Sequence, residues 1–384
     1  MTYSFDQIID RQQTESIKWH HYDPDVLPMW VADMDFRSPE PVIAALLDRV
    51  QHGVFGYPQE PAELRKVVVE RLAERYHWTV TPEEILLLPG VVTGFNLACH
   101  AFCQPGEDVL IQTPVYGPFL GAPKCAQLNR VESNLVRQAD GQYQIDFEEF
   151  ERTITEKTRL FILCNPHNPI GRVYTHDELI RMAEICLHHG LVICSDEIHC
   201  DLVFSGQTHI PMGSISPEIA RRTITLMAPS KTFNIAGLDC SVAVIQDAQL
   251  RKQFTSSGKG LVKGVNVLGL TAALAAYKDG QPWLDELLVY LESNRDFMVQ
   301  FVADNLPQIG MGIPEGTYLA WLDCRQLGLD QNPSEFFLKK ARVALNDGKG
   351  FGKGGEGFVR LNFGCPRSML AEALEKMAHA LAKR

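Results

Sequence analysis

The sequence has no excess of basic residues: 36 lysines and arginines stand against 47 aspartates and glutamates, and the formal net charge is −11 over 384 residues. Nucleic acids and anionic lipid surfaces bind basic patches, so we expect neither as a partner. No stretch approaches the roughly 18 consecutive apolar residues of a membrane span, and residues 1–20 carry charges where a secretory leader has an apolar segment. The composition predicts a soluble, unprocessed protein whose partners are small molecules and other copies of itself.

The sequence also has no CxxC pair among its ten cysteines, most of which lie within apolar segments. We therefore expect no metal-binding cysteine pair. Scattered thiols in apolar segments are typical of a reducing compartment, so we expect a cytoplasmic protein.

What is present is a regular alternation of short apolar strands and helical segments, in a chain whose 45% apolar residues can fill a sizeable core. The expected strands are Ile85–Leu88, Val109–Gln112, Leu160–Leu163, Leu191–Cys194, Thr223–Met227 and Val242–Ile245. Strands that alternate with helices predict an α/β protein with a mostly parallel sheet and helices on both faces.

After Ala276 the pattern changes to a long amphipathic helix from Gln281, strands at 316–322 and 358–363, and a helix at 335–345 between them. This pattern predicts a separate and smaller α+β unit. We therefore expect an N-terminal arm at 1–45 that packs with the small domain, a large cofactor-binding domain at 46–279 and a small C-terminal domain at 280–384.

A glycine-rich stretch lies at 347–357. A phosphate-binding P-loop needs a serine or threonine after its glycine and lysine, and then a helix. Here Gly354 follows Lys353 and no helix is predicted, so we expect a mobile surface loop.

Ligands of open α/β sheets bind beyond the carboxyl ends of the strands. The segments after five of the predicted strands carry polar residues, glycines and aromatics. They are PGVVT at 89–93, TPVYG at 113–117, NPHNP at 165–169, SDEIH at 195–199 and SK at 230–231. Five strands therefore bring candidate site residues to one rim of the sheet.

A lysine stands just after one of these strands, in the run APSKTFN at 228–234. Burial in an apolar setting lowers the pKa of an ammonium group, and the neutral amine of Lys231 is then a nucleophile toward a carbonyl cofactor. A pyridoxal phosphate site pairs such a lysine with an aspartate at the pyridine nitrogen, and Asp196 follows the preceding predicted strand. The alternatives are a solvated surface lysine and an aspartate that caps a strand end.

Three further residues suit the same kind of site. Asn168 can donate to the phenolic oxygen of the cofactor, or belong to the turn chemistry of an Asn-Pro pair. Tyr116 can stack on the pyridine ring, or be an ordinary core aromatic. Arg360 lies in an otherwise apolar predicted strand of the small domain, where it can bind a substrate carboxylate in bidentate geometry or lie solvated on an edge strand. If Arg360 binds substrate, the site lies between the domains and closure of the small one gates it.

A phosphate group needs backbone N–H groups at the start of a helix. The helix predicted after Gly90 offers those of Val91 and Val92, and Ser230 adds a hydroxyl group.

The run LPMWVADMDF at 27–36 places two aspartates between large apolar residues. This pattern indicates either a loop that lines the site or a structural arm whose aromatics pack on the core.

In their order along the chain, the runs NPHNPIG, SDEIHCDLVF, APSKTFNIAGL and GFVRLNFGCPR resemble the fold type I pyridoxal phosphate enzymes, the aspartate aminotransferase superfamily. The runs PMWVADMDF, HGVFGYP and SKTFNIAGL resemble its MalY/PatB group of cystathionine β-lyases, also called C–S lyases. The likeness extends from about Asp25 to the C-terminus.

The resemblance implies the roles already given to Lys231, Asp196, Asn168, Tyr116 and Arg360. It also implies that His199 stands where transaminases of the superfamily carry a tyrosine to the cofactor's phenolic oxygen. Tyr57 resembles the tyrosine that reaches the phosphate in the neighbouring subunit, which implies a homodimer with shared active sites. Asp239 departs from the pattern, because many relatives carry a phosphate-binding arginine there. Ser230, the helix start and Tyr57 are then left to hold the phosphate.

The reaction implied by the resemblance is β-elimination from L-cystathionine or a related cysteine S-conjugate, in which Lys231 takes the Cα proton and the thiolate leaves from Cβ. Pyruvate and ammonia are the remaining products. Three alternatives remain open: an aminotransferase that uses the same residues, a regulatory protein that restrains a transcriptional activator by contact, and a scaffold without cofactor.

Overall fold

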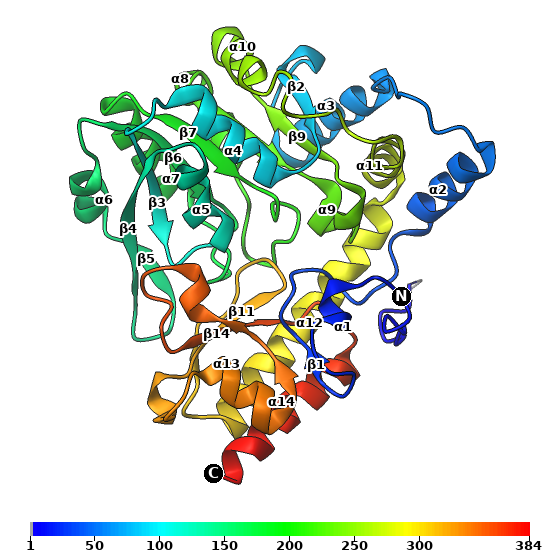
Figure 1. The fold of residues 1–384 in the computed structure, drawn as a ribbon, viewed down its shortest axis with the longest axis vertical. Helices are drawn as coiled ribbons and strands as arrows, with labels where there is room; N and C mark the ends of the chain where they lie inside the picture. The colour runs from blue at the N-terminus through cyan, green and yellow to red at the C-terminus, as the bar shows by residue number, and fades with distance from the viewer. Residues whose placement is uncertain (1–2) are drawn as a thin grey trace.

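The computed structural model describes residues 3–384, which form a large eight-stranded sheet, a small four-stranded sheet and the helices around them (Figure 1). The large sheet has the order β2 (Ile85–Leu88), β9 (Ser241–Val244), β8 (Thr223–Met227), β7 (Val192–Asp196), β6 (Thr158–Cys164), β3 (Asp108–Thr113), β4 (Asn129–Arg137) and β5 (Tyr143–Ile145). The central pairings from β8 to β4 are parallel, whereas β2, β9 and β5 join in antiparallel pairings. The predicted α/β class is confirmed.

Helices cover both faces of this sheet because successive residues of a strand point to opposite sides. In β3, Val109 and Ile111 pack with one set of helices, whereas Leu110 packs with the other. The first set is α4 (Val91–Phe102), α5 (Gly117–Cys125) and α10 (Ala248–Ser257), and the second is α6 (Phe147–Thr153), α7 (His176–His188) and α8 (Pro217–Ala220). Two apolar environments explain why the central strands are continuous apolar runs.

The small sheet is antiparallel throughout. Its order is β10 (Gly310–Met311), β11 (Leu319–Asp323), β14 (Phe358–Asn362) and β13 (Asn346–Asp347). Leu322, Val359 and Leu361 of this sheet share one core with α12 (Gln281–Asn305) and α14 (Arg367–Ala382), whereas Trp321 and Phe358 belong to a second cluster. In Figure 1 the long α12, in yellow, runs from the region of α11 (Val267–Asp279) down to the small sheet.

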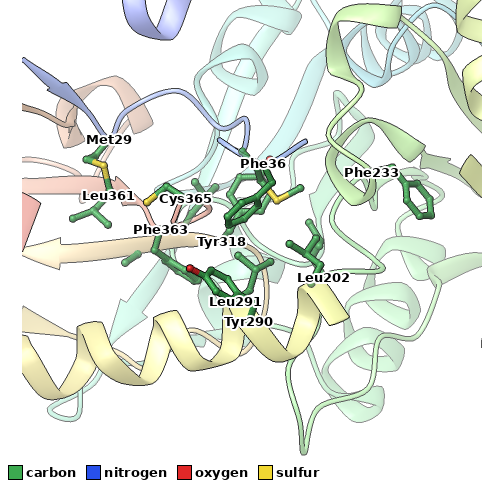
Figure 2. Close-up of a cluster of buried hydrophobic side chains, with 14 of the residues drawn as sticks. Met29, Phe36, Leu202, Phe233, Tyr290, Leu291, Tyr318, Leu361, Phe363 and Cys365 are labelled. Carbon is green, nitrogen blue, oxygen red and sulfur yellow. The ribbon is translucent and has the colours of Figure 1, made fainter. Parts of the chain in front are cut away.

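The N-terminal arm is fixed to the C-terminal part of the chain. After the short α1 (Ile17–His20), strand β1 (Leu27–Pro28) pairs in parallel with β12 (Val343–Ala344). Figure 2 shows Met29 and Phe36 of the arm in one buried cluster, Met29 near Leu361 and Phe36 near Tyr318. Tyr290 and Leu291 of α12 belong to the same cluster. The arm continues into α2 (Glu40–His52) and then α3 (Ala62–Tyr76), and both helices pack against α11.

Two secondary-structure predictions failed for identifiable reasons. Strands β4 and β5 were not predicted, because β4 is largely polar and only two of its residues are buried. The helix expected at 335–345 ends early: α13 (Pro333–Phe336) is followed by a π-helical turn at Phe337–Ala341 and then by β12. The partner of β12 is at the other end of the sequence, so local periodicity could not reveal it.

The surface loop expected at 347–357 is also wrong, because part of this segment is buried. Phe351 lies in the core, with its ring centroid 5.2 Å from that of Trp321, and its carbonyl oxygen accepts a hydrogen bond from the Val115 N–H at 2.8 Å. A Cβ atom at Gly355 would overlap the carbonyl oxygen of Gly348. The glycines here permit close backbone packing.

None of the helices within residues 3–384 is long and apolar enough to cross a membrane. All ten cysteines are free thiols, and Cys125 alone among them is exposed. The two sheets and the pairing of β1 with β12 are compatible with the expected boundaries at 45 and 279, and the three-part division stays a proposal.

Candidate active site

A cavity of about 460 Å³ lies beyond the carboxyl ends of the strands of the large sheet. Nine of the ten predicted site residues line it: Val91, Val92, Tyr116, Asn168, Asp196, His199, Ser230, Lys231 and Arg360. Eight of them follow or end strands of the large sheet, and Arg360 comes from β14 of the small sheet. The structure therefore brings together residues far apart in the sequence, while their individual roles stay predictions.

The sheet topology explains this convergence. Strands β3, β6, β7 and β8 run parallel, and β2 has the same direction because it and β8 are both antiparallel to β9. The carboxyl ends of all five strands therefore meet at one rim, as the sequence predicted.

Lys231 lies on α9 (Pro229–Thr232), a single helical turn just after β8. Its Nζ donates a hydrogen bond to the carbonyl oxygen of Ala32 at 2.6 Å. The pKa of the Lys231 ammonium is lowered to about 8: burial is the largest cause and the Arg360 guanidinium adds to it, whereas Asp33 and Asp196 oppose the shift. About a tenth of this amine is therefore neutral and nucleophilic at pH 7, far more than for a solvated lysine.

Asp196 is the last residue of β7 and is buried. Its Oδ1 accepts a hydrogen bond from the Ile198 N–H at 3.1 Å, so the capping interaction considered as an alternative is present as well. Burial raises the pKa of the Asp196 carboxyl to about 7, and the Glu197 carboxylate contributes to the increase. A cation beside this carboxyl, such as a protonated ring nitrogen, would favour its ionised form.

Arg360 is not solvated on an edge strand, because β14 lies between β11 and β13 and the residue is only 4% exposed. Its guanidinium donates to Asn168 Oδ1 at 3.0 Å, to the Trp30 carbonyl oxygen at 2.7 Å and to Asn346 Oδ1 at 2.6 Å. Within residues 3–384 its Nε has no hydrogen-bond partner. Burial lowers the pKa of Arg360 to about 10, which leaves the group charged at neutral pH.

His199 and Tyr116 occupy the same cavity. Burial lowers the pKa of His199 well below its usual value of 6.5, so the imidazole is neutral. Its buried Nδ1 has no hydrogen-bond partner in the described part of the chain. Burial raises the pKa of Tyr116, so its phenol is protonated at neutral pH.

The amino end of α4 forms another wall of the cavity. Gly90 is the N-cap residue and supplies no side-chain cap, so the first N–H groups of the helix are not satisfied by the cap. Val91, Val92 and Thr93 of this helix line the cavity, with Ser230 nearby. An anion held here would be stabilised by these N–H groups and by the helix dipole.

These observations fit pyridoxal phosphate. The cavity combines an amine of lowered pKa, a buried carboxyl, an open helix start and two buried nitrogen atoms without partners, on His199 and Arg360. A polar ligand that accepts hydrogen bonds would satisfy atoms that are costly to leave unpaired.

Tyr57 is the one predicted site residue outside the cavity. It is fully exposed in a segment, 51–60, whose residues are all exposed. Within one chain Tyr57 therefore does not contribute to the site.

Several residues at the site were not predicted individually. The backbone at 30–32 lines the cavity, and the Ala32 carbonyl oxygen also accepts a hydrogen bond from the Tyr318 hydroxyl at 2.9 Å. Asn346 accepts a hydrogen bond from Arg360, whose guanidinium carbon lies 5.1 Å from the centroid of the Phe351 ring.

The aspartates in the run at 27–36 were the one sequence signal for the region around residues 30–32. The run both lines the site and packs its apolar side chains into the core, so the two alternatives hold together.

The chain is similar to well-described proteins over almost its whole length. The family described as aminotransferase class I and II matches residues 24–377. "Cystathionine beta-lyase PatB" of Bacillus subtilis is 42% identical over 387 residues, which cover 99% of this chain and 100% of the relative. "Protein MalY" of Escherichia coli is 34% identical over 390 residues, which cover 99% of this chain and 99% of the relative. The crystal structure of cystalysin from Treponema denticola, which contains pyridoxal 5′-phosphate, superposes with a TM-score of 0.96 at 36% identity and 100% coverage of both chains.

Proposed function

The chain belongs to the class I and II aminotransferase family, and on that premise we propose that it is a pyridoxal-phosphate-dependent carbon–sulfur β-lyase. It cleaves L-cystathionine or related cysteine S-conjugates to a thiol, pyruvate and ammonia. The observation that carries this function is the convergence of Lys231, Asp196 and Arg360 on one cavity, in a fold shared with cystathionine β-lyases and C–S lyases. With L-cystathionine the thiol is homocysteine.

The cofactor would be held by residues at the ends of five strands of the large sheet. Lys231 would bind it covalently, Asp196 would pair with the ring nitrogen, and Asn168 and His199 would bind the phenolic oxygen. Tyr116 would pack against the ring. The N–H groups of Val91 and Val92 and the Ser230 hydroxyl would bind the phosphate. When bound, pyridoxal phosphate supplies a sink for the electron pair released from the substrate's Cα–H bond.

The protein's own groups position and move the proton. Arg360 binds the substrate carboxylate through its guanidinium, which fixes Cα relative to the lysine. The Nζ of Lys231 accepts the Cα proton, and its lowered pKa provides the required neutral amine near neutral pH. The Cα–Cβ double bond forms as the Cβ–S bond breaks, and the sulfur leaves with the bonding electrons and takes a proton. The released 2-aminoacrylate reacts with water to give pyruvate and ammonia.

The working form is a cytoplasmic homodimer in which Tyr57 of each copy reaches the phosphate in the other. Support comes from an exposed apolar surface formed by Leu47, Val50, Val54, Phe55 and Tyr57. A patch of this kind on α2 and the segment after it is typical of an interface.

Supplying purified holoenzyme with L-cystathionine, while pyruvate and free thiol are assayed together, tests the reaction. Equal amounts of both products are expected. An aminotransferase would instead pass the amino group to an added 2-oxo acid and release no thiol. If neither pyruvate nor a thiol is formed from L-cystathionine or from S-alkyl cysteines, the lyase function is contradicted.

A further inference from the structure

The cavity is lined by one carboxylate, that of Asp239, to which the proposed reaction gives no role. The charged side chains that line the cavity are Lys231, Arg360, Asp196 and Asp239. Arg360 donates hydrogen bonds to Asn168 in the loop after β6, to the Trp30 carbonyl oxygen and to Asn346. Asp239 lies close to Ser230, whose hydroxyl group donates a hydrogen bond to the carbonyl oxygen of the next residue, Cys240, at 3.4 Å.

The backbone fixes Asp239 at this place. It follows the 3₁₀ turn Ala236–Leu238, and its N–H donates to the Ala236 carbonyl oxygen at 3.3 Å. The Leu238 carbonyl oxygen accepts a hydrogen bond from Asn266 Nδ2 at 2.9 Å, which anchors the turn. Asp239 has a φ of 51°, in the left-handed region that aspartate, asparagine and glycine tolerate best.

Nothing in the described chain neutralises this carboxylate. Asp239 is exposed, and within residues 3–384 its side chain has neither a hydrogen bond nor an ion pair. The groups that would bind a phosphate here are neutral N–H and O–H donors, assisted by the partial charge of one helix end. A carboxylate that lines the same cavity repels a phosphate dianion, and solvent and salt weaken this repulsion because Asp239 is exposed.

We propose that Asp239 sets the affinity of this site for phosphorylated ligands, by opposing the phosphate group and making the bound cofactor exchangeable. This inference rests on the proposed function for the position of the phosphate. The carboxylate acts on the phosphate alone, so it leaves the affinity for the unphosphorylated aldehyde unchanged. At the dielectric of a solvent-open mouth the effect is about 3- to 10-fold in the dissociation constant.

The test compares wild type with Asp239→Asn, which keeps the shape and the left-handed backbone but removes the charge. After the cofactor is removed from each holoenzyme, dissociation constants for pyridoxal 5′-phosphate and for pyridoxal are measured by protein fluorescence and by the visible absorption of the bound aldehyde. Asp239→Asn should bind pyridoxal 5′-phosphate about 3- to 10-fold more tightly and pyridoxal equally well. The difference in affinity between the two proteins should shrink as the salt concentration is raised from about 0.02 to about 0.5 M, because the Debye length falls from about 20 Å to about 4 Å.

Glu74→Gln is the matched control, because Glu74 is exposed on α3 and does not line the cavity. Asp239→Gly, which also tolerates a positive φ, replaces Asp239→Asn if that variant is poorly folded. Unchanged or weaker binding of pyridoxal 5′-phosphate by the neutral variants, or equal tightening for pyridoxal, would overturn the role of Asp239 and leave the lyase function intact. Absence of pyridoxal 5′-phosphate binding by wild type would overturn both.

Discussion

Asn168 Oδ1 accepts a hydrogen bond from Arg360 at 3.0 Å, and this contact joins the loop after β6 of the large sheet to β14 of the small sheet. Both residues line the cavity. The residue proposed to face the cofactor and the residue proposed to bind the substrate carboxylate are thus directly connected. The proposed substrate binding at Arg360 would therefore be linked to the position of the small sheet relative to the cofactor.

Replacing Arg360 with lysine should raise the KM for L-cystathionine about 10- to 100-fold, because an ammonium group cannot form the bidentate contact with a carboxylate. Steady-state pyruvate formation measures the change. An S-substituted cysteamine, which lacks the carboxylate, is the control ligand: it should compete against wild type and Arg360→Lys with similar inhibition constants. A KM that stays at the wild-type value would place the carboxylate elsewhere.

Asn168→Ala should loosen Arg360 and raise KM by a smaller amount, about 5- to 20-fold, since it removes one hydrogen bond to a charged group. The same variant should alter the visible spectrum of the holoenzyme, because we propose that Asn168 also faces the cofactor. Asn134→Ala serves as a comparison, since Asn134 lies outside the cavity lining. An altered KM with an unchanged spectrum would restrict Asn168 to supporting Arg360.

The rate at which cofactor-free protein captures pyridoxal phosphate should rise with pH and level off above about 8. The neutral amine is the reactive form, and burial lowers the pKa of Lys231 to about 8. Stopped-flow absorption gives this profile. Borohydride reduction followed by peptide mass spectrometry should find the adduct on Lys231, and Lys231→Ala should lose both the adduct and turnover. Lys252→Ala, which changes a lysine outside the cavity lining, should keep both, and a profile that inflects near 10.5 would contradict the buried amine.

The free energy of unfolding of the cofactor-free protein should depend on pH through the carboxyl group of Asp196. Burial raises the pKa of its carboxyl to about 7, against about 3.9 in an unfolded chain. Between these pH values the folded state keeps a proton that the unfolded state has lost. The contribution of Asp196 to the free energy of unfolding therefore falls as pH rises from about 4 to about 7, by at most about 1.4 kcal/mol per pH unit. Urea titrations should show that this part of the slope disappears in Asp196→Asn. Parallel slopes for the two proteins would show that the carboxyl titrates normally.

Shared active sites can be tested by mixing two inactive variants. Tyr57→Ala lacks the proposed phosphate contact and Lys231→Ala lacks the amine, so each homodimer should be inactive at limiting cofactor. After dissociation and reassociation of equal amounts, half of the dimers are mixed and each has one intact site, which predicts about a quarter of wild-type activity. Pyruvate formation measures the recovery. No recovery, with mixed dimers demonstrated by native mass spectrometry, would place Tyr57 in its own subunit or outside the site.

The sequence by itself determined the alternation of strands and helices and the rim where five strands end, and it predicted that Lys231 and Asp196 lie together on that rim. Periodicity and the residues after each strand are local properties, so they can be recognised in the sequence without a structure. Only the tertiary structure decided that β1 pairs with β12, that Phe351 of the glycine-rich segment is buried, and that Arg360 bonds to Asn168 and to the Trp30 carbonyl oxygen. These contacts join segments distant in the chain, and their stability depends on the packing of the whole core, which no short stretch of sequence encodes.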